Sequence, residues 1–116
     1  MSELLIKQQT FSRLVPSLII HAHVLGFEVT LGDCFRDPRV HGKFGEKSSY
    51  SHRNSAHKLK LAIDLNLHKD GVYCTGTEAH RCLGAFWKER HPDNRWGGDF
   101  TKPDGNHYSH FYRGYV

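Results

Sequence analysis

The apolar residues near the start of the chain recur at helical spacing. The stripe that begins at Phe11 repeats every three or four positions and stops just before Gly26, a natural C-terminal cap. This spacing predicts a helix over residues 10 to 25, with Pro16 perturbing its first turns. Polar and apolar residues then alternate over 28 to 31, and this alternation predicts a short strand.

The clearest strand pattern lies in the middle of the chain. Leucine or isoleucine occupies every second position from Leu59 to Leu67, which is the period of a half-buried strand. Asp64 falls on the opposite face, away from the leucine core. Lys69-Asp70-Gly71 predicts a hairpin turn, and Val72-Tyr73 begins the return strand.

The remaining segments complete a mixed pattern. Residues 36 to 54 lack periodicity and predict a loop that rims a site. Thr75 to Glu78 has the spacing of a capping box and predicts a helix that ends before Pro92. A last strand is expected over 107 to 112, with its aromatic residues closing the core or lining a groove. The order of elements is typical of a single α+β domain with a small antiparallel sheet and flanking helices.

Charge and composition narrow the classes of function. A net charge of +4 favours an anionic partner, such as an anionic cell wall, but the basic residues are too scattered to indicate nucleic acid strongly. No apolar run is long enough for membrane insertion. The N-terminus lacks the pattern of a signal peptide and the 3 cysteines lack Cys-x-x-Cys spacing, so we expect a reducing, cytoplasmic compartment in the producing cell. The 10 histidines point to zinc.

His57, Asp64 and His107 are the candidate ligands of one zinc ion. A catalytic zinc takes three protein ligands and leaves one position for water. Seven residues of extended strand would span roughly 23 Å, so the chain must turn between His57 and Leu61 to bring the two ligands together. His110 is a rival of His107, but residues three apart in a strand face opposite sides, so only one can join.

Further residues are candidates for catalysis and substrate binding. Asp104 lies on a turn three residues before His107 and can act as the general base, with Asp99 as a rival. Arg36 is a candidate to stabilise an anionic intermediate or bind a substrate carboxylate. Ser55 either binds substrate or caps a turn, and Trp96 is a candidate for stacking on substrate.

Taken together, these motifs resemble the M15 family of zinc metallopeptidases, which includes phage L-alanyl-D-glutamate endopeptidases and D-alanyl-D-alanine carboxypeptidases. The resemblance extends from about Glu28 to Phe111. The matching residues are Ser55, His57, Ala62 and Asp64; Asp104 and His107; Trp96-Gly97-Gly98-Asp99-Phe100; and Arg36-Asp37-Pro38. The sequence departs from the family at Lys60, where a glycine is usual, and at Arg39, where glutamate or glutamine is expected.

This resemblance implies a Hedgehog/DD-peptidase-like zinc site on the open face of the sheet, with His57, Asp64 and His107 as ligands and Asp104 as the base. It implies hydrolysis of the peptide stems of bacterial peptidoglycan by a phage endolysin that cleaves the L-Ala-D-Glu bond, or by a D-Ala-D-Ala carboxypeptidase. We then expect a monomer that acts on peptidoglycan and not on nucleic acid. It would reach the cell wall through a separate pore.

Two other classes of function remain open from the residues alone. A small metal-dependent nuclease would use Asp104, Asn106, His107 and His110 and would cleave DNA with magnesium. A non-catalytic zinc-binding module would hold zinc with a closed fourth position and show no turnover. A further grouping of Cys74, His80 and Cys82 fits no structural zinc pattern.

Overall fold

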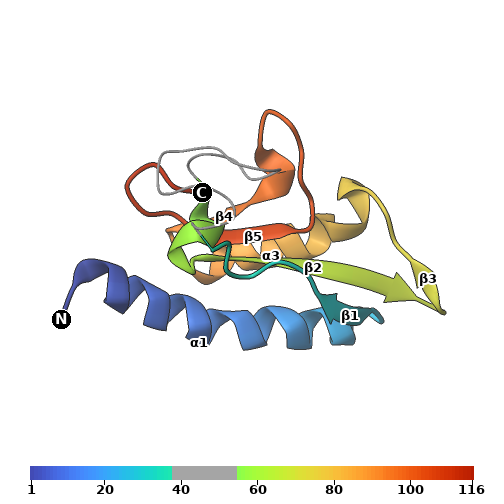
Figure 1. Ribbon diagram of the computed structural model, residues 1–116. Helices are drawn as coiled ribbons and strands as arrows, with labels where there is room; N and C mark the ends of the chain where they lie inside the picture. The colour runs from blue at the N-terminus through green and yellow to red at the C-terminus, as the bar shows by residue number, and fades with distance from the viewer. Residues whose placement is uncertain (38–54) are drawn as a thin grey trace.

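The computed structural model describes residues 1–37 and 55–116, and most of the predicted loop over 36–54 lies outside them. The elements are α1 (Glu3–Val24), β1 (Glu28–Leu31), η1 (Ala56–Leu59), β2 (Ala62–Lys69), β3 (Val72–Tyr73), η2 (Thr77–His80), α3 (Arg81–Arg90), β4 (Asn94–Trp96), η3 (Gly97–Asp99) and β5 (His107–His110) (Figure 1). This is the predicted α+β fold with a small antiparallel sheet and two helices.

The sheet brings together strands that lie far apart in the sequence. Its strand order is β1-β2-β5-β4, and β3 pairs with β2 beside this path. Ile63 of β2 lies opposite Tyr108 of β5, and Asp64 lies opposite His107. Opposite residues of an antiparallel pair share one face of the sheet. Asp64 and His107 therefore lie together on one face, and Ile63 and Tyr108 lie together on the other.

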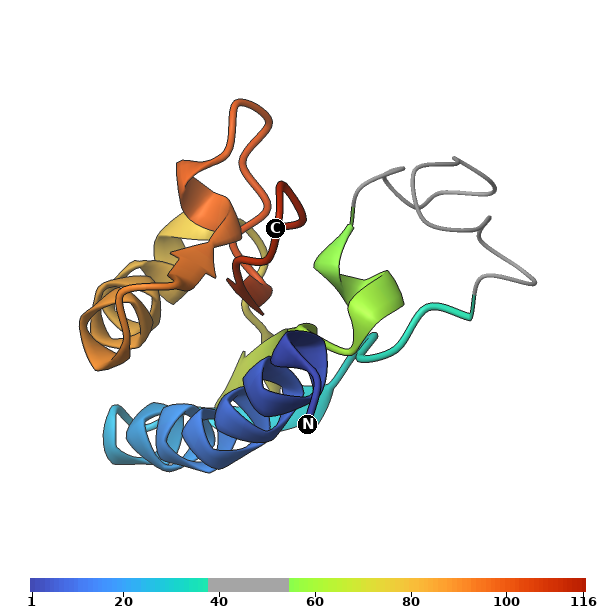
Figure 2. The ribbon, with the colours of Figure 1, turned by 90° about the vertical axis from the view of Figure 1, so that its left-hand side faces the viewer.

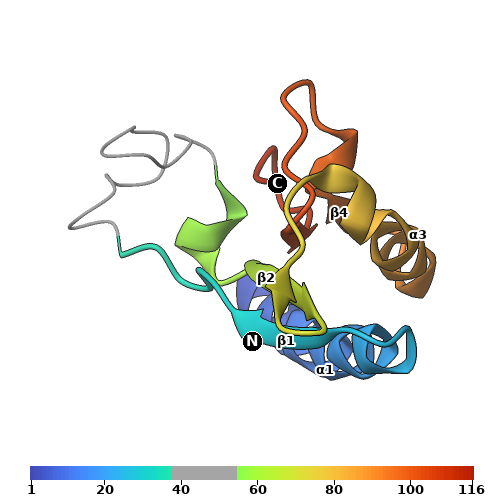
Figure 3. The same cartoon turned by 90° about the vertical axis from the view of Figure 1, so that its right-hand side faces the viewer.

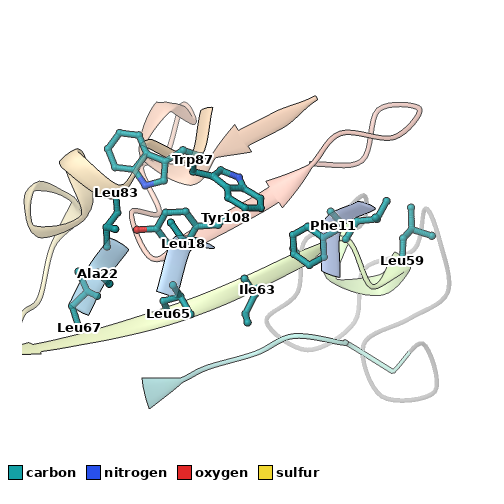
Figure 4. Packing of buried hydrophobic residues seen from close by; sticks show 14 residues of the cluster. Phe11, Leu18, Ala22, Leu59, Ile63, Leu65, Leu67, Leu83, Trp87 and Tyr108 are labelled. Carbon is teal, nitrogen blue, oxygen red and sulfur yellow. The ribbon is translucent and has the colours of Figure 1, made fainter. Parts of the chain in front are cut away.

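Both helices cover one face of the sheet, whereas η1 lies on the other side (Figures 2 and 3). Between helices and sheet lies the apolar core, in which Leu65, Leu67 and Tyr108 are fully buried against Leu18 and Trp87 (Figure 4). The period-two pattern of β2 therefore predicts the core face correctly. Burying a leucine side chain contributes about 1.5–3 kcal/mol, so the core fixes the face on which Asp64 stands.

The hairpin between β2 and β3 is also confirmed. Asp70 and Gly71 form its turn, with φ angles of 51° and 78°. Positive φ at both central residues matches the type I′ turn that joins twisted strands, and Asp-Gly is among its preferred sequences.

α1 begins at Glu3, so the prediction that this helix starts at residue 10 is wrong. Ser2 caps the helix, since its Oγ accepts a hydrogen bond from the Leu5 N–H at 3.1 Å. Polar contacts hold the first turns: Lys7 pairs with Asp93 at 2.7 Å, and the Gln8 amide donates to the Leu59 carbonyl at 2.8 Å. Leu4 also packs against the core, but polar residues 7 to 10 interrupt the apolar spacing between Leu4 and Phe11. No helix in the described ranges is long and apolar enough to cross a membrane.

The capping box predicted over Thr75 to Glu78 is absent. Gly76, with φ of 89°, turns the chain before η2, and no side chain caps that turn. The Glu78 carboxylate instead accepts a hydrogen bond from Arg81 Nε at 2.9 Å. α3 then starts at Arg81 and ends at Arg90, before Pro92 as predicted.

Candidate metal centre

A sharp turn after η1 places His57 over the strand that carries Asp64. The Ser55 hydroxyl begins η1 by accepting a hydrogen bond from the His57 N–H at 3.2 Å. Lys60 ends it in the left-handed conformation, with φ of 59° and ψ of 36°. That conformation costs a residue other than glycine about 1–2 kcal/mol. The turn expected between His57 and Leu61 is therefore present, and it forms at a lysine.

The three candidate ligands converge on one point from η1, β2 and β5. His57 Nε2 lies 3.1 Å from Asp64 Oδ1 and 3.1 Å from His107 Nδ1. His107 Nδ1 lies 3.5 Å from Asp64 Oδ1. Both histidines are buried, at 0% and 4% exposure. One ion can therefore reach a donor atom from each of the three side chains.

The hydrogen bonds around His57 and Asp64 suit metal binding. His57 Nδ1 lies 2.9 Å from the Cys34 carbonyl oxygen, which can only accept, so Nδ1 donates and Nε2 keeps its lone pair. Metal-binding histidines donate their second ring N–H in this way. Burial raises the pKa of Asp64, but the contacts of its carboxylate with the His107 and His57 rings outweigh burial and hold that pKa below its usual value. Two imidazole nitrogens and an ionised carboxylate form a donor set that fits zinc.

Arg36 and Ser55 support this centre. Arg36 Nη2 lies 3.9 Å from Asp64 Oδ2, and Nη1 donates to the Ser55 hydroxyl at 3.3 Å. Arg36 Nε also contacts Asp33 Oδ2 at 3.3 Å. Ser55 therefore caps a turn, one of its two predicted roles. Contact of either residue with substrate stays a prediction.

A cleft of about 710 Å³ opens beside the ligands, and His107, Arg36 and Asp104 contribute to its wall. The Asp104 side chain is exposed, and its backbone carbonyl accepts a hydrogen bond from the His107 N–H at 3.1 Å. Asp99 lines the same cleft, but its carboxylate is paired with Lys88 at 2.8 Å. The position of Asp104 next to a ligand therefore favours it over Asp99 as the general base.

Gly97 allows the segment that carries Asp104 to pack closely. The Asp104 N–H donates to the Gly97 carbonyl at 2.8 Å, and a Cβ at Gly97 would lie 2.8 Å from His107 Cβ and clash with the Asp104 backbone.

We expect Gly97→Ala to lower kcat/KM by about 100-fold, because displacement of catalytic groups by an ångström has effects of this size. Kinetics with unfolding curves check this result. Gly71→Ala, on a distant turn with φ of 78°, controls for loss of stability alone. Equal activity in the two variants would contradict the expected effect of Gly97→Ala.

Trp96 is buried, whereas its predicted role of stacking on substrate requires an accessible ring. It lies opposite Tyr108 in the β4–β5 pairing, on the helix face of the sheet, and is only 2% exposed. Its indole N–H donates to the Gly105 carbonyl at 2.7 Å. This burial argues against stacking on substrate and gives Trp96 a role in holding the residue after Asp104. Short strand β4, which buries it, has no periodic signal in the sequence.

His110 lies on the face opposite His107, as strand geometry predicts. Its Nδ1 pairs with Asn94 Oδ1 at 2.8 Å. The nuclease hypothesis needs His110 beside His107, Asp104 and Asn106. The structure does not bring these four side chains to one face.

A second histidine and aspartate group, His91, Asp93 and His110, lies near the N-terminal end of α1. The Asp93 carboxylate is paired with Lys7 at 2.7 Å, and the Asp93 N–H donates to His91 Nδ1 at 3.0 Å. Asn94 holds His110 as described above. These contacts join α1 to the loop before β4. They explain why the three side chains lie close together without a bound metal ion. Neither candidate group in the described ranges contains a cysteine.

Comparison with known proteins agrees with the geometry of the centre. A family model described as D-alanyl-D-alanine carboxypeptidase, of the M15 peptidases, matches residues 49–110, more than half of the chain. The matched span includes His57, Asp64, Asp104 and His107. A search among curated proteins gives no match. The predicted resemblance to M15 peptidases is thus confirmed at the level of the family, and the chain belongs to the D-alanyl-D-alanine carboxypeptidase family of M15 peptidases.

Proposed function

We propose that this chain is a zinc-dependent endopeptidase that cleaves the L-alanyl-D-glutamate bond in peptide stems of bacterial peptidoglycan, as phage endolysins do. The observation that carries the proposal is the convergence of His57, Asp64 and His107, with ligand atoms 3.1–3.5 Å apart, beside a cleft that also contains Asp104. This arrangement supplies three metal ligands, an open approach and a proton acceptor within one site.

The residues of the centre have distinct roles in the proposed reaction. A zinc ion held there would polarise the scissile carbonyl and lower the pKa of water to about 7. Asp104 would accept the proton of the attacking water and pass it to the leaving amine. Arg36 contacts the second oxygen of Asp64 and so keeps the first directed at the two histidines. The hydrogen bond from Nδ1 to the Cys34 carbonyl fixes the orientation of the His57 ring.

Two cationic side chains in the cleft wall can bind an acidic peptide beside the carboxylates of Asp99 and Asp104. Arg36 and Lys102 contribute cationic side chains to its wall, and carboxylates such as that of D-glutamate pair favourably with such groups. The net charge of +4 also suits an anionic cell wall. We therefore propose peptidoglycan as the partner. A monomer suffices, since one chain supplies every residue of the proposed centre.

Purified cell walls test this function. We expect the zinc-loaded protein to release new amino groups, a chelator to abolish the release, and added zinc to restore it. Mass spectrometry of the products should then find stems cut between L-alanine and D-glutamate. Bound zinc without turnover would support a non-catalytic module instead, and magnesium-dependent cleavage of DNA would support a nuclease.

D-Ala-D-Ala carboxypeptidase activity is the second candidate. It is favoured by the description of the matching family model. Release of free D-alanine from pentapeptide stems, with the L-alanyl-D-glutamate bond left intact, would identify this activity and overturn the endopeptidase proposal.

A further inference from the structure

A second, smaller pocket of about 230 Å³ adjoins the metal centre's cleft at Asp104. Both cavities share Asp104 as a wall residue. The smaller pocket lies between β3, η2 and the segment that leads into β5. Its polar side chains include Thr77, His80 and Asn106, and it contains no lysine or arginine. A peptide that crosses Asp104 would therefore meet the cationic side chains Arg36 and Lys102 in the cleft and none in the smaller pocket.

His80 is the most constrained side chain of this pocket. It is 3% exposed, and its Nδ1 lies 2.7 Å from the Tyr108 hydroxyl. Because an imidazole nitrogen accepts a hydrogen bond more strongly than a phenol oxygen does, the hydroxyl donates to Nδ1 and the imidazole proton resides on Nε2. Burial lowers the pKa of His80 to about 4, so the ring is neutral near pH 7.

The Nε2–H of His80 has no hydrogen-bond partner among the described residues. Among the described residues, the fully enclosed side-chain atoms that lack a partner are His107 Nε2 and Ser109 Oγ. Because His80 Nε2 is not among them, it is not fully enclosed. A nearly buried residue that lines a pocket therefore keeps one donor accessible from that pocket. Thr77 and Asn106, which stand beside it, likewise have side chains that bond to no other described residue.

We propose that this pocket is a second substrate subsite, in which His80 Nε2–H donates to a neutral amide carbonyl of the peptide stem. The pocket lacks a cationic side chain, which disfavours a carboxylate there. The acidic residue of the substrate then lies in the cleft with Arg36 and Lys102. This subsite rests on the proposed peptidase function and adds a direction in which the substrate binds.

Replacement of His80 tests the subsite. We expect His80→Leu to raise KM for a synthetic stem peptide about tenfold and to leave kcat within twofold, because one hydrogen bond of about 1.4 kcal/mol is lost. His80→Gln, whose amide can place a donor near the same point, should recover part of the affinity. His23→Leu, at an exposed position near the end of α1, is the matched control. An unchanged KM in His80→Leu would overturn the subsite.

Nitrogen NMR provides a test that does not depend on turnover. We expect the His80 proton on Nε2 in the free protein, and a shift of that resonance when the stem peptide is added to the Asp104→Asn protein. A proton on Nδ1, or an unshifted resonance at saturating peptide, would overturn the subsite. Absence of peptidoglycan cleavage by the unaltered protein would instead overturn the proposed function, so the two failures are distinguishable. Unfolding curves of both His80 variants identify any loss of the fold.

Discussion

Asp104→Asn should keep zinc bound and the fold intact while hydrolysis falls by about 10²–10⁴-fold, the usual contribution of a general acid–base group. The exposed asparagine has the same size as the aspartate it replaces, so packing is unaffected. The amide cannot accept the proton of the attacking water. Measured kcat, together with zinc content by elemental analysis, checks this expectation.

Asp99→Asn is the matched variant, because Asp99 lines the same cleft but is paired with Lys88. We expect this variant to keep most of its activity. Normal turnover by Asp104→Asn would rule out Asp104 as the base, and a large loss in Asp99→Asn alone would assign the base to Asp99.

His57→Ala should lower zinc content and thermal stability together. The change removes one of three ligands at a fully buried position. An ion present at 1,000 times its dissociation constant stabilises the folded state by about 4 kcal/mol, and most of that contribution disappears with the ligand. Differential scanning calorimetry with and without chelator measures the effect.

The chelator comparison separates metal loss from the cavity that the smaller side chain leaves. In the unaltered protein, chelation should lower the melting temperature substantially, whereas in His57→Ala it should have little further effect. His23→Ala, at an exposed position, should behave like the unaltered protein. A zinc content unchanged in His57→Ala would remove this residue from the ligand set.

Local sequence patterns predict the part of the fold that holds Asp64. The period-two alternation of β2 reflects burial of one face, and the Asp-Gly turn reflects backbone conformation, so both are readable from neighbouring residues. The turn at Lys60 follows from the distance that two ligands of one ion can span. Lys60 has φ of 59° without being a glycine, which a local preference would not predict.

Other features depend on contacts between distant segments and leave no such signal. The polar residues Lys7 and Gln8 hold the start of α1 through Asp93 and the Leu59 carbonyl. They interrupt the apolar spacing that would otherwise mark this part of the helix. The face of Trp96 follows from the pairing of β4 with β5. A three-residue strand shows no period, so its pairing cannot be deduced from the sequence.

The candidate site divides in the same way. His57, Asp64, Asp104 and His107 are identified by spacing and family resemblance, and the structure gathers the three ligands while Asp104 lines the adjoining cleft. The pocket of His80 has no motif, because it forms only where η2 packs against the segment after Asp104. The grouping of the side chains that would set the direction of the substrate thus depends on tertiary packing.

Anomalous diffraction at the zinc absorption edge tests the central claim most directly. We predict one strong peak about 2.0–2.2 Å from His57 Nε2, Asp64 Oδ1 and His107 Nδ1, with a fourth position open to the cleft beside Asp104. A peak elsewhere in the molecule, or a fourth protein ligand that closes the site, would contradict a catalytic zinc at this centre.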